Sequence, residues 1–373
     1  MNNYNKFVAI TATSIMMILS IGIAVLPKKD FSENENRVLK GKPQFSKEKL
    51  LSGEFMDDIE NYMNDHFPGR DKLVSIKGNF QQLLGYREMN GTFLVGDRLL
   101  QHIDKPNTKA FASKFNRLEG NLADYNGTLS LMMVPTDAGV YDDLLPANAP
   151  DVVDEKEAIQ YIYNHVSCQT VDVLTALKKE KENNNVFYNL DHHWSYYGAY
   201  IGYKTYMESI GLTPAGLDEI KCTTVSDDFR GTLYSKVLID SMASDSIVAP
   251  DLSGLNLTVT NVDKKEVRQT YYYDEFLKQK DKYCYFGGGN PAKMTIENPD
   301  AKNDRELLIV KDSYANSLIP FLVRDFKKIH ILDPRYYVRH ISDYAKSEEG
   351  ITDILVLYNL DSLNTNSGIV KLK

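Results

Sequence analysis

The stretch LLIVKDSYANSLIPFLVRDFKKIHIL, from Leu307 to Leu332, decides the fold. Its apolar run at Leu307–Val310 predicts a buried strand, because continuous hydrophobic runs are typical of strands that are covered on both faces. Asn316–Phe326 has the spacing of an amphipathic helix, and Ile329–Leu332 is a second apolar strand. A strand, a helix and a strand in this order favour a right-handed crossover and a parallel α/β sheet.

The same alternation extends on both sides of this stretch. We expect strands at 92–95, 99–103, 129–134, 169–173 and 354–358, and helices at 109–125, 154–165, 174–181, 195–210 and 337–345. Residues 213–300 fit the rhythm less well and predict a β-rich insertion, with turns at Pro250 and Gly287–Asn290. The sequence therefore predicts a doubly wound, mostly parallel α/β sheet over residues 86–373.

The N-terminus carries an uncharged apolar run from Phe7 to Leu26, between Lys6 and the pair Lys28-Lys29. A helix of this length rises about 30 Å, the thickness of a bilayer's hydrocarbon core. A cleaved signal peptide and a retained anchor both fit. We favour an anchor over residues 1–29, because the run is longer than a typical signal h-region and no small-x-small cleavage site precedes Pro27. More Lys follows the run than precedes it, so charge does not decide the orientation.

Residues 30–85 are predicted to form a polar stalk and a helical lead-in. Apolar residues recur at helical spacing from Phe55 to Met63, the Pro and Gly of His66–Arg70 break that helix, and a second helical stretch covers Leu73–Leu84.

Composition excludes some classes of function. A net charge of -8 argues against a nucleic-acid partner, because phosphate binding relies on clustered Lys and Arg. The three cysteines, Cys168, Cys222 and Cys284, form no CxxC pair, which argues against a structural zinc site.

Ser313 is the first candidate for chemistry. It follows the predicted strand Leu307–Val310 and precedes the predicted helix, and sites in open α/β sheets form at the carboxyl ends of strands. Such a serine has an exposed hydroxyl close to a helix N-terminus, which stabilises developing negative charge. On spacing alone an ordinary helix cap is the more common explanation, and it stays open here.

A serine nucleophile needs a base and a group that orients the base. Asp191 and His193 meet both needs, because residues two apart in extended chain point to the same side. Two alternatives stay open: Asp191 caps the helix that follows, or Asp191, His192 and His193 bind a metal. Three adjacent residues cannot all face one ion in regular structure, so we expect no metal.

The motif Asp191-His192-His193-Trp194 resembles the signature of the bacterial DHHW family, a branch of the alginate O-acetylation proteins within the SGNH hydrolase-like superfamily. Four further segments are similar to segments of that family: DHFPGRD at 65–71, FGGGN at 286–290, KDSYANS at 311–317 and DPRYY at 333–337. Together they extend from about residue 30 to the C-terminus, so the resemblance covers the whole part of the chain after the apolar run.

The resemblance implies an SGNH-like fold and a triad of Asp191, His193 and Ser313 in that chain order. It implies an acetyl-serine intermediate, no cofactor and no metal. The block Gly-Asp-Ser of most SGNH enzymes reads Lys311-Asp312-Ser313 here, so the resemblance gives position 311 no oxyanion role. Further oxyanion or substrate candidates are Gly289 and Asn290 in the glycine turn and Arg335 and Thr136 at strand ends. Alternatives stay open for these: a plain tight turn for the glycines and a surface ion pair for Arg335.

The expected activity is O-acetylation of an exported or cell-wall polysaccharide by a single-pass membrane protein whose catalytic domain is extracytoplasmic. The resemblance implies a membrane-bound O-acyltransferase as the partner that supplies acetyl groups. A carbohydrate esterase with the same triad and a non-catalytic glycan-binding envelope protein are the alternatives. The sequence does not identify the polysaccharide, the acyl donor or the oligomeric state.

Overall fold

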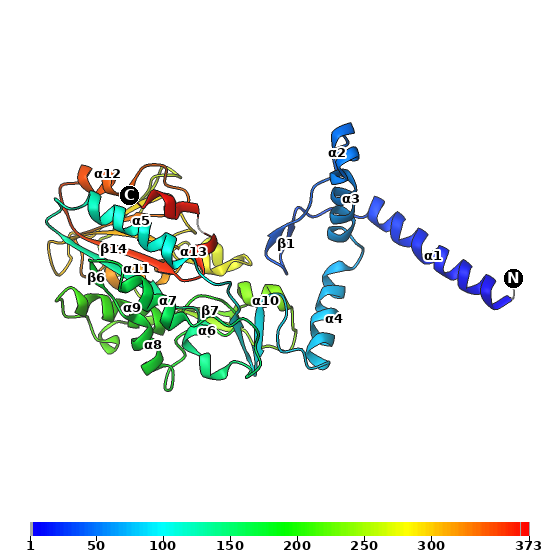
Figure 1. Ribbon diagram of the computed structural model, residues 1–373, viewed down its shortest axis with the longest axis horizontal. Coiled ribbons are helices and arrows are strands. Elements are labelled where there is room, and N and C mark those ends of the chain that lie inside the picture. The colour runs from blue at the N-terminus through cyan, green and yellow to red at the C-terminus, as the bar shows by residue number, and fades with distance from the viewer. Residues whose placement is uncertain (1–2, 366, 373) are drawn as a thin grey trace. The chain divides into compact units, whose positions relative to one another are not determined.

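The computed structural model describes residues 3–365 and 367–372, which divide into two compact units (Figure 1). The first unit comprises Met1–Tyr86 and Ser235–Met242, and the second comprises Arg87–Tyr234 and Ala243–Lys373. The elements of residues 3–86 are α1 (Asn3–Val25), β1 (Phe31–Ser32), β2 (Arg37–Val38), α2 (Lys47–Ser52), α3 (Glu54–Asp65) and α4 (Arg70–Leu83).

Helix α1 contains the apolar run that the sequence predicts to be membrane-spanning. Residues Asn3–Ile23 are long and apolar enough to cross a membrane, with a mean hydropathy of 1.9. A signal sequence has the same length and composition, so the helix is compatible with both interpretations.

The two helices after the predicted stalk begin and end close to where their sequence patterns do. Between α3 and α4, the segment 65–71 is held by ion pairs to the β2 region: Arg37 pairs with Asp65, and Arg70 pairs with Glu35. The bonds from Arg37 lower the pKa of Asp65 to about 2. This polar cluster stabilises the turn that Pro68 and Gly69 make between the helices.

The second unit is built around an eight-stranded sheet. Its first elements are β3 (Thr92–Val95), β4 (Arg98–Gln101), α5 (Thr108–Asn121), β5 (Thr128–Val134), α6 (Asp137–Val140), α7 (Glu155–Tyr163), β6 (Gln169–Thr170), α8 (Val173–Glu180) and α9 (Tyr196–Ser209). They are followed by β7 (Cys222–Phe229), α10 (Thr232–Val237), β8 (Asp245–Pro250), β9 (Thr258–Asn261), β10 (Glu266–Arg268), β11 (Lys293–Glu297), β12 (Glu306–Lys311), α11 (Ala315–Leu322), β13 (Lys328–Leu332), α12 (Ile341–Ser347), β14 (Ile351–Asn359) and α13 (Ser362–Thr365). Short 3-10 turns lie at 142–144, 217–219, 274–278, 282–285 and 367–371.

The strands of the main sheet have the order β10-β9-β11-β13-β12-β14-β5-β6. Strands β13, β12, β14, β5 and β6 are parallel, so their carboxyl ends share one edge. The interior strands among them are apolar and buried, as the sequence predicts. Figure 1 shows α5 and α12 on one side of β14 and α8 and α9 on the other, which agrees with a doubly wound arrangement.

Residues 213–300 are rich in strands, and part of this segment belongs to the main sheet. Strands β9, β10 and β11 extend the main sheet in antiparallel pairing, and β11 pairs directly with β13. Within residues 213–300, β7 and β8 form a separate two-stranded ribbon. Pro250 is the last residue of β8 rather than a turn, whereas Gly287, Gly288 and Gly289 all have positive φ and make the predicted turn.

Two predicted helices are shorter than their apolar patterns. Helix α11 ends at Leu322 instead of Phe326, where the side-chain amide of Asn298 donates to the carbonyl of Val323 at 2.7 Å. Helix α12 begins at Ile341 instead of Tyr337, and the residues before it include a turn in which Tyr337 N donates to Asp333 O at 2.8 Å.

Candidate active site

Ser313 lies in the turn between β12 and α11, at the carboxyl edge of the parallel strands. The buried carboxylate of Asp312 holds this turn: it accepts from Tyr314 N at 3.0 Å, from Asn359 N at 2.6 Å and from the Ser362 hydroxyl at 2.7 Å. Burial raises the pKa of Asp312. Helix α11 has Tyr314 as its N-cap and no side-chain cap bond, so the alternative that Ser313 is a helix cap is wrong.

The segment 191–194 precedes α9, whose N-cap is Ser195. The Ser195 hydroxyl accepts from Tyr197 N and Gly198 N, so Asp191 does not cap this helix. The indole N–H of Trp194 donates to Tyr314 O at 2.9 Å and to the Ser317 hydroxyl at 3.0 Å. The tryptophan therefore joins this segment to the segment that carries Ser313.

Asp191, His193 and Ser313 form one continuous chain of hydrogen bonds. Nδ1 of His193 lies 2.6 Å from Asp191 Oδ1, and Nε2 lies 2.8 Å from the Ser313 hydroxyl oxygen. Asp191 is 1% exposed and His193 is 4% exposed, whereas Ser313 is partly open to solvent. This arrangement suits general-base activation of a serine, because the carboxylate fixes the imidazole tautomer that has a free Nε2 lone pair.

Thr232 completes the surroundings of Asp191. Its backbone N–H and its hydroxyl both donate to Asp191 Oδ2, at 2.8 and 3.1 Å. Burial acts to raise the pKa of Asp191, but the charges of His192 and His193 and the bonds from His193 and Thr232 together hold that pKa well below its usual range. Gly231 allows the backbone next to Thr232 to lie this close to the Asp191 carboxylate, because a β-carbon at position 231 would lie 2.1 Å from Asp191 Oδ2.

Tyr283 covers the face of the candidate base. Its ring is stacked on that of His193, and its hydroxyl is 3.2 Å from Ser313 O and 3.0 Å from the Ser317 hydroxyl. Tyr283 comes from the loop after β10, so three separate segments of the chain hold the imidazole in place.

The glycine turn is tied to the Ser313 turn by a buried lysine. Lys311 Nζ donates to Asn290 Oδ1 at 2.8 Å and to Asn316 Oδ1 at 2.7 Å, and the side chain is 1% exposed. The amide of Asn316 donates to Gly289 O at 3.3 Å. Burial lowers the pKa of Lys311 to about 8. Lys311 and Asn316 thus hold the Gly289-Asn290 turn against the Ser313 turn.

The side chains of Arg335 and Thr136, the other two candidates from the sequence, are both engaged with carboxylates and form no hydrogen bond or ion pair with Ser313. The Arg335 guanidinium forms a bidentate ion pair with the buried carboxylate of Asp333, which matches the ion-pair alternative. Thr136 is completely buried and its hydroxyl donates to Glu155, so the structure does not bring it to the open side of Ser313.

A metal is the competing occupant of the segment 191–193. One ligand atom from each of Asp191, His192 and His193 lies within 4.8 Å of the others. However, both ring nitrogens of His193 are already engaged, and Nδ1 of His192 is 2.5 Å from the Thr232 hydroxyl. An ion would have to break these bonds, so the described geometry fits serine chemistry better.

Sequence reasoning missed four residues of this site: Gly231, Thr232, Tyr283 and Lys311. The first three lie in no motif, and only Lys311 had a signal, because it replaces the glycine of the usual Gly-Asp-Ser block. A buried lysine needs hydrogen-bond acceptors. Asn290 in the segment 286–290 and Asn316 in the segment 311–317 could therefore have been predicted as its partners.

Both a protein-family model and solved structures are similar to this chain. The model of the family described as "DHHW protein" matches residues 108–332. The crystal structure of a DHHW family protein from Eubacterium siraeum has 26% identity and a TM-score of 0.66, and the match covers 76% of this chain and 95% of that one. Bacillus cereus PatB1 with a sulfonyl adduct has 21% identity and a TM-score of 0.63, covering 76% and 98%. None of the curated proteins compared with the chain matches significantly.

Proposed function

Because this chain belongs to the DHHW protein family, we propose that it is a serine O-acetyltransferase that modifies an exported or cell-wall polysaccharide. The observation that carries the proposal is the hydrogen-bond chain from Asp191 through His193 to Ser313. A buried carboxylate, an imidazole and a partly open serine in this geometry are the groups that acyl transfer requires.

The reaction proceeds by double displacement. Ser313 Oγ attacks the carbonyl carbon of the acetyl donor while His193 Nε2 takes the hydroxyl proton. The tetrahedral intermediate then expels the donor oxygen, which receives that proton. In the second half, His193 takes the proton of a sugar hydroxyl, the sugar oxygen attacks the acetyl carbon, and Ser313 regains its proton as it leaves. Asp191 stays ionised throughout and stabilises the imidazolium.

The oxyanion of each tetrahedral intermediate needs donors near Ser313. We assign this role to the Ser313 backbone N–H, for which the described part of the chain offers no acceptor, and to the Gly289-Asn290 turn. Asn290 Oδ1 is occupied by Lys311 and Asn316. Among the described residues, the side-chain N–H groups of Asn290 and the backbone N–H groups of Gly289 and Asn290 have no hydrogen-bond acceptor, and we assign them to the substrate.

We further propose that α1 is retained as a membrane anchor and that the second unit is extracytoplasmic; the length and apolar composition of α1 support a membrane span. Acetyl groups would then be supplied across the membrane by a membrane-bound O-acyltransferase, and no cofactor is required. We assign Arg335, with its ion pair to Asp333, to the rim of the substrate site rather than to the chemistry.

The test uses the purified protein, an activated acetyl ester and an oligosaccharide acceptor. We expect acetyl transfer to the sugar to outpace hydrolysis, and mass spectrometry to find the acetyl group on Ser313. Ser313→Ala should abolish both, and a chelator should change neither. Because PatB1 carries a sulfonyl adduct, a sulfonyl fluoride is the matching inactivator, with Ser313 as the expected site. Hydrolysis without transfer would instead identify an esterase, and an inert wild type would favour a glycan-binding protein.

A further inference from the structure

Helix α4 of the first unit carries a stripe of exposed apolar side chains that runs from its first turn to its C-cap. Its five members recur at helical spacing and are between 49% and 81% exposed: Leu73, Ile76, Phe80, Leu83 and Leu84. A continuous apolar patch of this kind marks a surface that binds a protein or a membrane. We call it the α4 stripe.

Another side of α4 is already packed against the first unit. The Ser75 hydroxyl donates to Asp240 Oδ1 at 2.8 Å, and the Asn79 amide donates to Asp240 Oδ2 at 3.0 Å. A β-carbon at Gly78 would lie 2.1 Å from Val237 O, so the two backbones lie close together there. These contacts lie within one unit and fix the direction in which the α4 stripe faces.

Two lysines border the α4 stripe, one on either side. Lys72 lies four residues before Ile76, and Lys77 lies four residues after Leu73, so each is a neighbour of the stripe on the helix surface. Both are exposed, and neither forms an ion pair within the residues that the structure describes. Lysines in such positions extend along apolar surface and place their charges among phosphate headgroups. The combination fits the surface of an anionic bilayer.

The start of α4 lies beside the end of the apolar helix α1. Lys29 pairs with Asp71 at 3.1 Å, and a β-carbon at Gly22 would lie 2.7 Å from Pro68 Cγ. Gly22 belongs to the last turn of the apolar span Asn3–Ile23. Helix α4 has 14 residues and is therefore about 21 Å long. With α1 retained in a membrane, the whole stripe stays close to the surface of that membrane.

We propose that the α4 stripe docks on the anionic surface of the bilayer that α1 anchors, with α4 lying along the headgroups and its apolar side chains below them. This inference rests on the retention of α1 proposed above, and it involves neither the triad nor acetyl transfer. A single anchoring helix leaves the first unit free to rotate on the membrane, whereas two contacts limit that rotation.

The test is quenching of tryptophan fluorescence by brominated lipids. Full-length protein is reconstituted into vesicles of phosphatidylcholine and phosphatidylglycerol, with or without bromine on the acyl chains. Phe80→Trp places a reporter in the stripe, and Gln82→Trp places one at an exposed position away from it. The native Trp194 is completely buried and gives the wild-type background.

A docked helix buries its apolar face about 5–10 Å into the boundary of the acyl chains, so the Phe80→Trp reporter should lose about half of its emission to brominated lipid. The Gln82→Trp reporter should lose little. Thermal unfolding followed by circular dichroism shows that each variant is folded.

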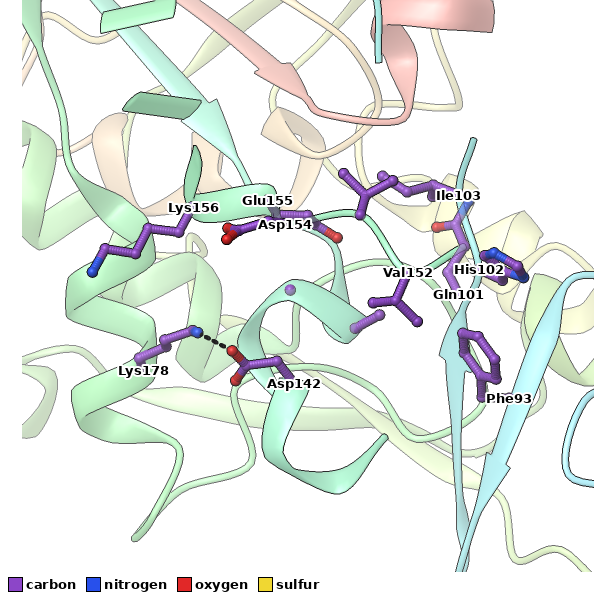
Figure 2. Close-up of a pocket in the computed structure, with 13 residues that line it drawn as sticks. Phe93, Gln101, His102, Ile103, Asp142, Val152, Asp154, Glu155, Lys156 and Lys178 are labelled. Atoms are coloured by element: carbon purple, nitrogen blue, oxygen red, sulfur yellow. Dashed lines mark hydrogen bonds and ion pairs between the residues drawn. The ribbon is translucent and has the colours of Figure 1, made fainter. Parts of the chain in front are cut away.

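Neutral substitutions made in Phe80→Trp test the contribution of charge. Lys72→Gln and Lys77→Gln should each lower the ratio of docked to undocked helix about fivefold in these vesicles. Neither should change it in vesicles of phosphatidylcholine alone. Lys156→Gln is the matched control, because Lys156 is an exposed lysine of the second unit, on the wall of the pocket that Figure 2 shows.

Three measurements keep the outcomes apart: flotation with the vesicles tests the retention of α1, brominated lipid tests the docking, and acetyl-ester turnover tests the proposed chemistry. Equal quenching of the two reporters, or none in protein that floats, would overturn the docking. A Phe80→Trp emission that is blue-shifted but insensitive to bromine would show that protein covers the stripe, which also overturns it. Protein that does not float would overturn both the retained anchor and the docking, and would leave the triad untouched.

Discussion

The ring of Tyr283 lies parallel to the imidazole of His193, with centroids 3.7 Å apart and an angle of 11° between the planes. The same residue reaches Ser313 O through its hydroxyl, so one side chain contacts both the candidate base and the backbone of the candidate nucleophile. Stacking of this kind restricts the rotation of the imidazole about its side-chain bonds.

Tyr283→Leu should therefore lower kcat for an acetyl ester by about tenfold, a loss comparable to one aromatic pair, while KM stays the same. Tyr283→Phe keeps the ring and loses only the hydroxyl, so we expect a smaller effect. The measurement is steady-state kinetics of both variants. A Leu variant with wild-type kcat would show that Asp191 alone orients His193.

Gly231→Ala should disable the acid of the triad without replacing a titratable residue. The new β-carbon would lie 2.1 Å from Asp191 Oδ2, so the carboxylate must move, and displacement of about 1 Å can cost about 100-fold in rate. Gly254→Ala is the control, since nothing lies within 4 Å of a β-carbon there. Equal kcat for the two variants would contradict the role of Asp191.

Lys311→Met should loosen the Gly289-Asn290 turn. The substitution keeps most of the apolar stem but removes the Lys311 donor from Asn316 Oδ1 and one of the two donors to Asn290 Oδ1, which costs about 1–3 kcal/mol of unfolding free energy. We expect kcat to fall as well, because the turn carries the assigned oxyanion donors. Urea unfolding and acetyl-ester kinetics check this, with the exposed Lys346→Met as control.

The stability of the second unit should decrease between about pH 4 and pH 7. Burial raises the pKa of Asp137 and of Glu155 to about 7 each. The folded state therefore holds these protons more tightly than the unfolded state, so their contribution is complete below the unfolded pKa and is lost as pH rises through 7, at about 1.4 kcal/mol per pKa unit.

Asp137→Asn should flatten this decrease. Asp137 Oδ1 accepts from Gln101 N and Ala138 N, and an asparagine keeps that acceptor while it no longer titrates. Urea denaturation at pH 5, 6, 7 and 8 compares the two proteins. Parallel pH profiles would exclude Asp137 as a source of the dependence.

The sequence was most informative where one segment carries both a structural pattern and a motif. The apolar run Leu307–Val310 predicted a buried strand, and the position of Ser313 just after it predicted a polar side chain at the carboxyl end of that strand. Both features can be recognised from neighbouring residues alone. Asp191 and His193 were likewise predictable as a pair, since they are two residues apart. The structure brings these three together, while their catalytic role stays a proposal.

The remaining parts of the site depend on contacts that are not local. Thr232 reaches Asp191 across 41 positions of sequence, and nothing in its own neighbours marks it. Strands β9 and β10 are short and partly exposed, so their apolar pattern does not distinguish a separate ribbon from an extension of the main sheet. Thr136 follows a strand end, where site residues are expected. Its hydroxyl is nevertheless buried, because it donates to Glu155, and that contact cannot be seen in the sequence around Thr136.

The Asp312 carboxylate, which is held by Asn359 and Ser362, has a consequence for biosynthesis. Asp191 and His193 are synthesised long before Ser313, and the turn that carries Ser313 is complete only after residue 362 has left the ribosome. Contacts that close over so many residues form late in folding. Under the proposed function, a nascent chain that has not yet emerged as far as residue 362 therefore lacks the complete Ser313 turn, and acyl transfer begins only with the finished domain.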